Sequence, residues 1–313
     1  MKFENYTALR KKVARLVKKG QLAAAVEILE EAKSRIPDRL YEITFRQARL
    51  YIDLGQYEKS LEAFEYGLQR NVVYPIWEEW DFWDPLRKYD RFEKILAENS
   101  RRQAEATART EPQLRVVTPK GYAGGGQYPL FLVLHGWNDS LKGTMAYWRS
   151  KRLAKEFIVA YIQSSQVVDK YSFGWTDMNL GRKDIRKMYK KLAEEYEIDE
   201  KRVIVGGFSQ GGLMALDAAL SRTLPAVGFV VFEVGGGLPD SLRVDNLKKA
   251  APGLRGSLIF GEEEFTMKEQ AEILENLQAA GLDYRRVTTH SGHWYPKKFS
   301  RFLDEALAFV LPQ

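Results

Sequence analysis

The sequence of 313 residues contains no cysteine and only three histidines, His135, His290 and His293. Without thiols the chain has no disulfide bond, no cysteine nucleophile and no cysteine-ligated metal. Three histidines leave few nitrogen ligands for a metal site. We therefore expect neither a metal ion nor another cofactor.

Long apolar runs are also missing. No stretch of 18 or more apolar residues occurs, so we expect no membrane-spanning helix. The first residues lack the apolar core of a signal peptide. The net charge of +6 is spread along the chain without a nucleic-acid-binding motif, so we expect no nucleic-acid partner. These absences predict a cytoplasmic protein.

The most informative segment follows a strand-like apolar run at residues 202–207. It is a Gly-x-Ser-x-Gly pattern with an apolar helical pattern behind it, Gly207-Phe208-Ser209-Gln210-Gly211. In such a segment the serine stands on a strained strand-to-helix turn that exposes its hydroxyl. A Cβ two positions on either side would clash, which explains the glycines. Because the bare pattern arises by chance in roughly one chain in ten, a turn that binds phosphate or merely packs is the alternative.

A nucleophilic serine needs a base within hydrogen-bond reach, and behind such a turn the chain order is serine, acid, histidine. Only His290 and His293 follow Ser209. Gly292 leaves His293 free on a loop, whereas His290 ends a predicted strand. We predict His293 as the general base, with activity rising through about pH 6–7. The alternative for either histidine is a packing or surface role.

The acid that orients the histidine should follow a late strand. Residues 256–260 form that strand, and three consecutive glutamates follow it. We predict Glu264 as the acid and Glu263 as its alternative, with Asp177 and Glu233 as more remote candidates. At least one of the three glutamates is instead part of a solvated acidic turn that opens a helix.

Two backbone N–H groups complete the predicted site as an oxyanion hole. One belongs to Gln210, the residue after the serine, and the other to Trp137, which follows the apolar strand at 130–134. Each donor of this kind contributes a few kcal/mol to transition-state stabilisation. His135 is then structural, with its ring in a hydrogen-bond network.

These motifs resemble the α/β-hydrolase fold, specifically the phospholipase/carboxylesterase group that includes acyl-protein thioesterases and related bacterial esterases. The resemblance covers residues 112–313 and is carried by residues 134–136, 163–166, 173–177 and 198–212, the last with its Gly-Phe-Ser-Gln-Gly-Gly core. It implies Ser209 as nucleophile, His293 as base, and main-chain donors at Trp137 and Gln210. The chain departs from the group at Glu264, where an aspartate is usual.

The order of predicted elements indicates the same α/β fold class. Helical patterns lie between most of the strand-like runs, which predicts a mostly parallel sheet covered by helices on both faces. Catalytic residues then lie at the carboxyl ends of the strands. The predicted strands are 114–118, 129–135, 157–163, 202–207, 227–234, 256–260 and 284–289, and the predicted helices are 144–155, 182–197, 209–221, 266–281 and 296–310.

Residues 1–108 show almost no strand signal and predict a separate helical domain, with the catalytic domain at 109–313. Gly20-Gln-Leu22 recurs 35 residues later as Gly55-Gln-Tyr57, and small residues recur with it at Ala25 and Ser60 and at Ala32 and Gly67. This pattern resembles tetratricopeptide repeats, helix–turn–helix units of about 34 residues. About two repeats are fewer than a free-standing array needs, so we expect them to lean on the hydrolase domain or on a second copy.

An aromatic stretch at residues 74–83 follows the repeats. Trp77, Trp80, Phe82 and Trp83 are too many apolar rings for an exposed linker. We predict a domain interface for them, with the mouth of the active site and a partner-protein surface as alternatives.

We therefore expect a serine esterase that cleaves a small-molecule carboxylic ester or thioester through a Ser–His–Glu triad and an acyl-enzyme. A peptidase or amidase on the same fold would use the same groups. A partner-docking protein is a further alternative, in which the repeats bind another protein or a second copy of the chain.

Overall fold

The computed structural model of the chain describes residues 5–78, 80–123, 125–250, 253–261 and 267–311. The chain divides into two compact units. The first is Met1–Ala108 with Val168–Lys170, and the second is Arg109–Val167 with Tyr171–Gln313.

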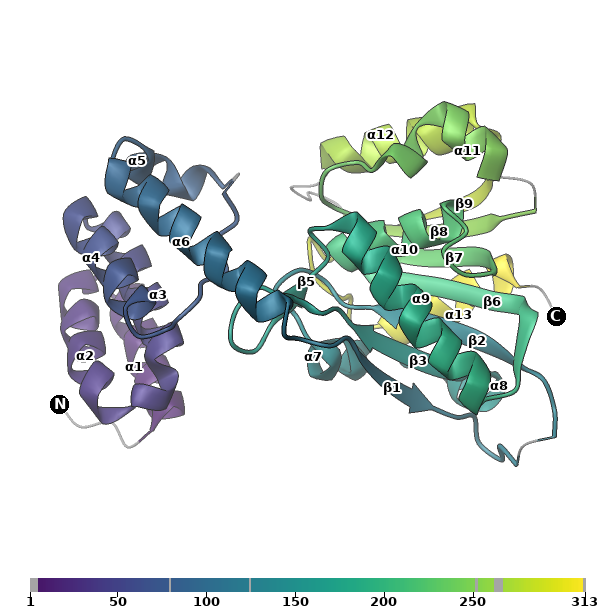
Figure 1. Cartoon of the computed structure of the whole chain (residues 1–313), viewed down its shortest axis with the longest axis horizontal. Helices are drawn as coiled ribbons and strands as arrows, with labels where there is room; N and C mark the ends of the chain where they lie inside the picture. The colour runs from purple at the N-terminus through teal and green to yellow at the C-terminus, as the bar shows by residue number, and fades with distance from the viewer. Residues whose placement is uncertain (1–4, 79, 124, 251–252, 262–266, 312–313) are drawn as a thin grey trace. The chain divides into compact units, whose positions relative to one another are not determined.

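The first unit contains helices and no strand among its described residues (Figure 1). Helix α1 packs on α2, and α3 packs on α4. A short 3-10 turn and α5 lead into the long helix α6. The bounds are α1 Tyr6–Lys18, α2 Leu22–Arg35, α3 Leu40–Asp53, α4 Tyr57–Leu68, α5 Asp84–Arg87 and α6 Asp90–Thr107.

The two helix pairs repeat one local geometry. Gly20 and Gly55 each end a helix with positive φ, at 71° and 69°, a region that glycine enters without steric cost. The small residues that recur in the sequence are all buried, which lets the helices approach closely: Ala25, Ala32, Ser60 and Gly67.

The core of this unit takes in part of the aromatic stretch. Trp83 and Tyr74 are fully buried among side chains of the same helical unit, so the predicted interface role is wrong for Trp83. Tyr74 Oη lies 2.8 Å from Thr44 Oγ1. The Asn99 side chain makes two hydrogen bonds to the backbone of Tyr74. It accepts one from the Tyr74 N–H and donates one to the Tyr74 carbonyl. Trp80, in contrast, is 39% exposed.

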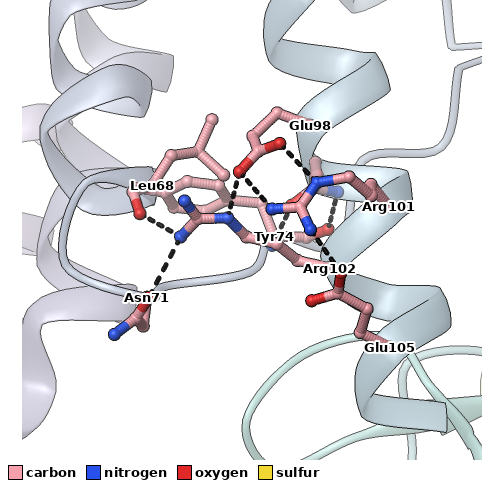
Figure 2. Close-up of polar contacts among 8 residues, drawn as sticks. Leu68, Asn71, Tyr74, Glu98, Arg101, Arg102 and Glu105 are labelled. Atoms are coloured by element: carbon pink, nitrogen blue, oxygen red, sulfur yellow. Dashed lines mark hydrogen bonds and ion pairs between the residues drawn. The ribbon is translucent and has the colours of Figure 1, made fainter. Parts of the chain in front are cut away.

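Arg102 of α6 ties that helix to its neighbour α4 (Figure 2). Glu98 accepts hydrogen bonds from Arg101 and Arg102, at 2.8 and 2.6 Å. Arg102 also donates to the carbonyl of Leu68, the last residue of α4. A cation there complements the partial negative charge of the helix C-terminus.

The second unit is built on a seven-stranded sheet with the order β1-β3-β2-β6-β7-β8-β9 among its described residues. The first strand runs antiparallel to β3, and all other neighbours are parallel. The strands are β1 Gln113–Val117, β2 Tyr128–Leu134, β3 Ile158–Gln163, β6 Ile198–Phe208, β7 Ala226–Phe232, β8 Arg255–Gly261 and β9 Asp283–Thr289. All seven predicted strands are present within a few residues.

Helices cover both faces of this sheet, as the α/β prediction requires (Figure 1). One face packs against α9 Met178–Glu195, α10 Gln210–Leu220, α11 Val244–Ala250 and α12 Met267–Ala279. The other packs against α7 Leu141–Tyr147, α8 Lys151–Glu156 and α13 Phe299–Val310. Within the described ranges, no helix combines the length and apolar content that crossing a bilayer demands.

The single helix predicted at 144–155 is wrong, because the chain breaks it into α7 and α8. Trp148 leaves the helical region with ψ 64° and buries its ring. Ser150 is extended, and its hydroxyl accepts from the Leu153 N–H at 3.1 Å, which starts the second helix as an N-cap. The sequence also gave no sign of α11 or of the small hairpin of β4 Gln166–Val167 and β5 Phe173–Gly174.

Candidate active site

Ser209 occupies the turn between β6 and α10. Its φ of 53° and ψ of −124° lie outside the regions that residues with a Cβ normally adopt. Its N–H donates to the carbonyl of Phe232 at the end of β7, at 2.9 Å. The sheet and the helix therefore hold a strained backbone that carries the hydroxyl at the carboxyl end of the central strand.

The two glycines of the motif are both sterically required. A Cβ on Gly207 would lie 2.2 Å from the Gly211 carbonyl oxygen. One on Gly211 would lie 2.0 Å from the carbonyl oxygen of His135. Both contacts are with backbone, which cannot move aside, so the clash expected from the sequence is present.

His293 reaches Ser209 from the loop between β9 and α13. Its Nε2 lies 2.9 Å from Ser209 Oγ, a hydrogen-bond distance across 84 residues of sequence. Burial lowers the pKa of His293 to about 4, so the ring is neutral at pH 7 and able to accept a proton. The Phe208 ring packs against the imidazole, with the two ring centroids 5.0 Å apart, and shields it from solvent.

His290, the other late histidine, lies just past the end of β9 with an exposed side chain. Thr289, before it, is buried and exchanges a 2.7 Å hydrogen bond with Ser291. The alternation along the strand thus turns His290 outward, while the following loop turns His293 toward Ser209.

Both glutamates predicted for the acid, Glu264 and Glu263, lie outside the described residues. The end of the preceding strand does lie beside the histidine loop. A Cβ on Gly261 would be 2.6 Å from the carbonyl oxygen of Gly292 and 3.0 Å from its nitrogen. The last residue of β8 therefore lies against the loop that carries His293.

Glu233, a remote candidate in the sequence, is fully buried in the same corner. It follows β7 with a φ of 49°, a costly conformation for a glutamate. Its Oε1 would lie 2.7 Å from a Cβ on Gly261, and its Oε2 accepts from Gln270 Nε2 at 3.3 Å. Asp177 instead caps helix α9, with its carboxylate accepting from the N–H groups of Asn179 and Leu180.

His135 is buried and organises the loop after β2. The Ser164 N–H donates to its Nε2 at 3.1 Å, so the ring hydrogen is on Nδ1, which donates to the Gly136 carbonyl at 2.7 Å. Burial lowers the pKa of His135 to about 4 and keeps the ring neutral. The network expected for His135 is therefore present.

Trp137 and Gln210, the predicted oxyanion donors, sit on segments that pack together. A Cβ on Gly136 would lie 3.0 Å from the Phe208 ring, so the loop before Trp137 abuts the serine turn. Gln210 begins α10, where backbone N–H groups have no acceptor within the helix. Its side-chain oxygen accepts from the Trp175 N–H at 2.6 Å, which fixes the start of the helix.

The sequence did not predict a group of aromatic rings that packs against Phe208, the neighbour of Ser209. Tyr147 stacks on Tyr295 with ring centroids 4.2 Å apart, and Trp294 packs edge-on against Tyr147 at 5.7 Å. The available signal was the pair Trp294-Tyr295 directly after His293. The partner rings come from α7, about 150 residues earlier, so only the fold brings them together.

Comparisons with known proteins agree with this architecture. Residues 177–309 match the model of the Phospholipase/Carboxylesterase family. The structure of an uncharacterized protein from Bacillus cereus is similar to 98% of this chain and 99% of its own, with 21% identity and a TM-score of 0.53. A thermophilic esterase from the Planctomycetes species Thermogutta terrifontis covers 64% of this chain and 90% of its own, with 15% identity and a TM-score of 0.49. No curated protein matches the chain.

The family match spans α9 to α13 and so includes the turn of Ser209 and the loop of His293. The Bacillus cereus likeness shows a similar fold over nearly the full length of both chains. The second unit has the α/β-hydrolase fold, and its residues 177–309 are similar to the phospholipase/carboxylesterase family.

Proposed function

We propose that the protein is a serine hydrolase that cleaves carboxylic esters through an acyl-enzyme intermediate. The observation that carries this proposal is the 2.9 Å contact between His293 Nε2 and Ser209 Oγ on a strained strand-to-helix turn. A nucleophile and a base within hydrogen-bond reach are the signature of covalent acyl transfer. The family match supports ester hydrolysis in general.

In the first step Ser209 Oγ attacks the ester carbonyl while His293 Nε2 takes the hydroxyl proton. The carbonyl oxygen becomes an oxyanion, and we assign its stabilisation to the backbone N–H groups of Trp137 and Gln210. His293 then returns the proton to the departing alkoxide, which leaves as the alcohol. Water, deprotonated by the same imidazole, attacks the acyl-enzyme and releases the acid.

A carboxylate behind the imidazole would hold its tautomer and stabilise the imidazolium. We assign this role to Glu264, with Glu263 as the alternative, since both follow β8 in sequence and β8 ends at Gly261, beside Gly292. Glu233 is a third candidate because its buried carboxylate faces the same corner. Comparing kcat/KM for Glu264→Gln, Glu263→Gln and Glu233→Gln tests the assignment. The largest loss should fall on Glu264, and a larger loss at either other position moves the role there.

The direct test of the function is hydrolysis of p-nitrophenyl esters with acyl chains of two to sixteen carbons, with Ser209→Ala in parallel. Serine-dependent turnover is the expected result, and the best chain length separates a small-ester carboxylesterase from a lipid-directed enzyme. Thioesters and matched amides complete the series. Faster cleavage of the amide than of its ester would instead favour a peptidase.

A second candidate function is partner docking by the helical unit. The recurring Gly20 and Gly55 turns favour it, since paired helices of this period build binding surfaces in tetratricopeptide proteins. Residues 1–108 are then proposed as a tetratricopeptide-like domain and 109–313 as the catalytic domain. A full-length Ser209→Ala protein that captures one specific partner, or itself, would support docking.

A further inference from the structure

The exposed rings beside the site carry an inference that rests on the proposed function and deepens it. Two large aromatic side chains of the second unit stand at the surface next to His293. Trp294 is 57% exposed and Tyr147 is 37% exposed. Single exposed apolar residues are common on protein surfaces. Trp294 and Tyr147 contact each other, and Trp294 directly follows the proposed base, so they form a local apolar surface at the loop that carries His293.

Tyr147 and Trp294 both pack against the buried ring of Tyr295. Tyr147 lies flat on Tyr295, with ring planes 8° apart. Tyr295 is 9% exposed, and its hydroxyl accepts from Trp148 Nε1 at 2.9 Å. The ring of Tyr295 also packs against the ring of Phe208, the residue before the proposed nucleophile, with the two ring centroids 4.8 Å apart. The ring contacts therefore run from the buried Phe208, beside Ser209, through Tyr295 to Tyr147 and Trp294 at the surface.

A pre-formed edge of this kind matches a planar aromatic group. Flat rings gain about 0.5–1.5 kcal/mol from offset or edge-to-face contact beyond the burial of their area. A saturated ring of similar size gains the burial but not the ring–ring term. We infer that Trp294 and Tyr147 form a subsite for an aromatic ring in the acyl half or the alcohol half of the ester substrate.

The test uses two pairs of esters that differ only in ring saturation. Methyl 3-phenylpropanoate and methyl 3-cyclohexylpropanoate probe the acyl half, and benzyl acetate and cyclohexylmethyl acetate probe the alcohol half. The full-length enzyme should show a phenyl-over-cyclohexyl preference in kcat/KM of about two- to tenfold in at least one pair. The pair that shows it identifies the half of the ester that the subsite holds.

Variants assign the preference to the rings. Trp294→Ala and Tyr147→Ala should reduce the phenyl-to-cyclohexyl ratio of kcat/KM to about one, and Trp294→Phe should keep part of the preference. Val117→Ala is the matched control, because Val117 is 45% exposed and pairs with the start of β3, at the other end of the strands from Ser209. No preference in either pair, or a preference that survives Trp294→Ala, overturns the inference.

A binding measurement separates this inference from the proposed function. Saturation-transfer NMR on Ser209→Ala should show stronger binding of the phenyl ester than of its cyclohexyl analogue, and Ser209→Ala/Trp294→Ala should lose the difference. If no ester is hydrolysed but this difference persists, the subsite stands and the hydrolase proposal fails. If esters are hydrolysed without any difference, the subsite fails and the hydrolase proposal stands.

Discussion

The buried hydrogen bonds among the helices of the first unit join residues that are closer in sequence than the proposed nucleophile and base of the α/β unit. In the helical unit, Ser60 Oγ donates to the carbonyl of Ala48, 12 residues away, and Thr44 meets Tyr74 over 30 residues. In the α/β unit, Ser209 meets His293 over 84 residues. The local contacts hold neighbouring helices together, whereas the distant one exists only when the whole sheet has formed.

Backbone strain shows the same contrast. In the helical unit the positive φ values belong to glycines and to Asn71, a residue type that tolerates this region. In the α/β unit Ser209 and Glu233 also adopt it, at 53° and 49°. Such conformations cost about 1–3 kcal/mol each and persist where the surroundings impose them. Ser209 and Glu233 lie at the proposed site, while Asn138 and Arg222 adopt positive φ elsewhere in the described part of this unit.

Replacing one serine in each unit should show the largest difference between the two units. Ser209→Ala should lower kcat/KM for an ester by about 10³-fold or more, because it removes the proposed nucleophile, with little change in Tm. Ser60→Ala should instead cost about 1 kcal/mol of stability, from the lost buried hydrogen bond, and leave activity intact. Ester kinetics and thermal unfolding of both variants check this. More than a few per cent of activity in Ser209→Ala would contradict it.

A glycine in each unit gives the next largest contrast. Gly211→Ala forces a Cβ to within 2.0 Å of the His135 carbonyl oxygen, so we expect a loss above about 3 kcal/mol and loss of activity. Gly55→Ala meets open space and suffers only from its positive φ, at about 1 kcal/mol. Urea unfolding measures both, and equal losses would show that the turn of Ser209 is less constrained than its contacts indicate.

One arginine in each unit tests how the burial of an ion pair affects stability. Arg182 binds both oxygens of the fully buried Asp217. Arg182→Ala leaves that carboxylate buried without its cation and should cost about 3 kcal/mol. Arg101, on the exposed face of α6 in the helical unit, pairs with Glu98 in water (Figure 2), so Arg101→Ala should leave the unfolding midpoint unchanged. Similar midpoints for the two variants would contradict the account.

Low pH should reduce the free energy of unfolding of the α/β unit, because burial lowers the pKa values of His135 and His293. Burial lowers the pKa of His135 to about 4, below the ordinary value of 6.5, so between these values the unfolded chain binds more protons. The contribution of His135 to the free energy of unfolding is complete above pH 6.5 and is lost as the pH falls toward 4. Between pH 7 and pH 5 this loss is about 2 kcal/mol. The shift of His293 has the same sign. Unfolding free energies from pH 4 to 8 test this, and His135→Gln should flatten the dependence.

The same burial shifts the expected pH–rate profile. The lowered pKa of His293 keeps the base neutral to lower pH than an ordinary histidine. The acid limb of kcat/KM should therefore have its midpoint below pH 6.5, rather than in the range of about pH 6–7 that the sequence suggested. A midpoint above pH 7 would show that the imidazolium is stabilised more strongly than burial opposes it.

Much of the sheet was predictable because its inner strands are buried on both faces and read as continuous apolar runs. The turn of Ser209 was predictable because a side chain at Gly207 would clash with the backbone of Gly211, which is near it in sequence. The break at Trp148 was not, since it depends on where that ring is buried and on the capping by Ser150. The position of Glu233 beside Gly261 was equally hidden, because only strand order brings the two together.

The central claim is that Ser209 is a nucleophile activated by His293. Its most direct test is covalent labelling of the intact full-length protein with a fluorophosphonate, read by mass spectrometry and peptide mapping. The account predicts one adduct per chain, on Ser209, absent in Ser209→Ala and formed much more slowly in His293→Ala. An adduct on another residue, or labelling of Ser209 at the same rate without His293, would contradict it.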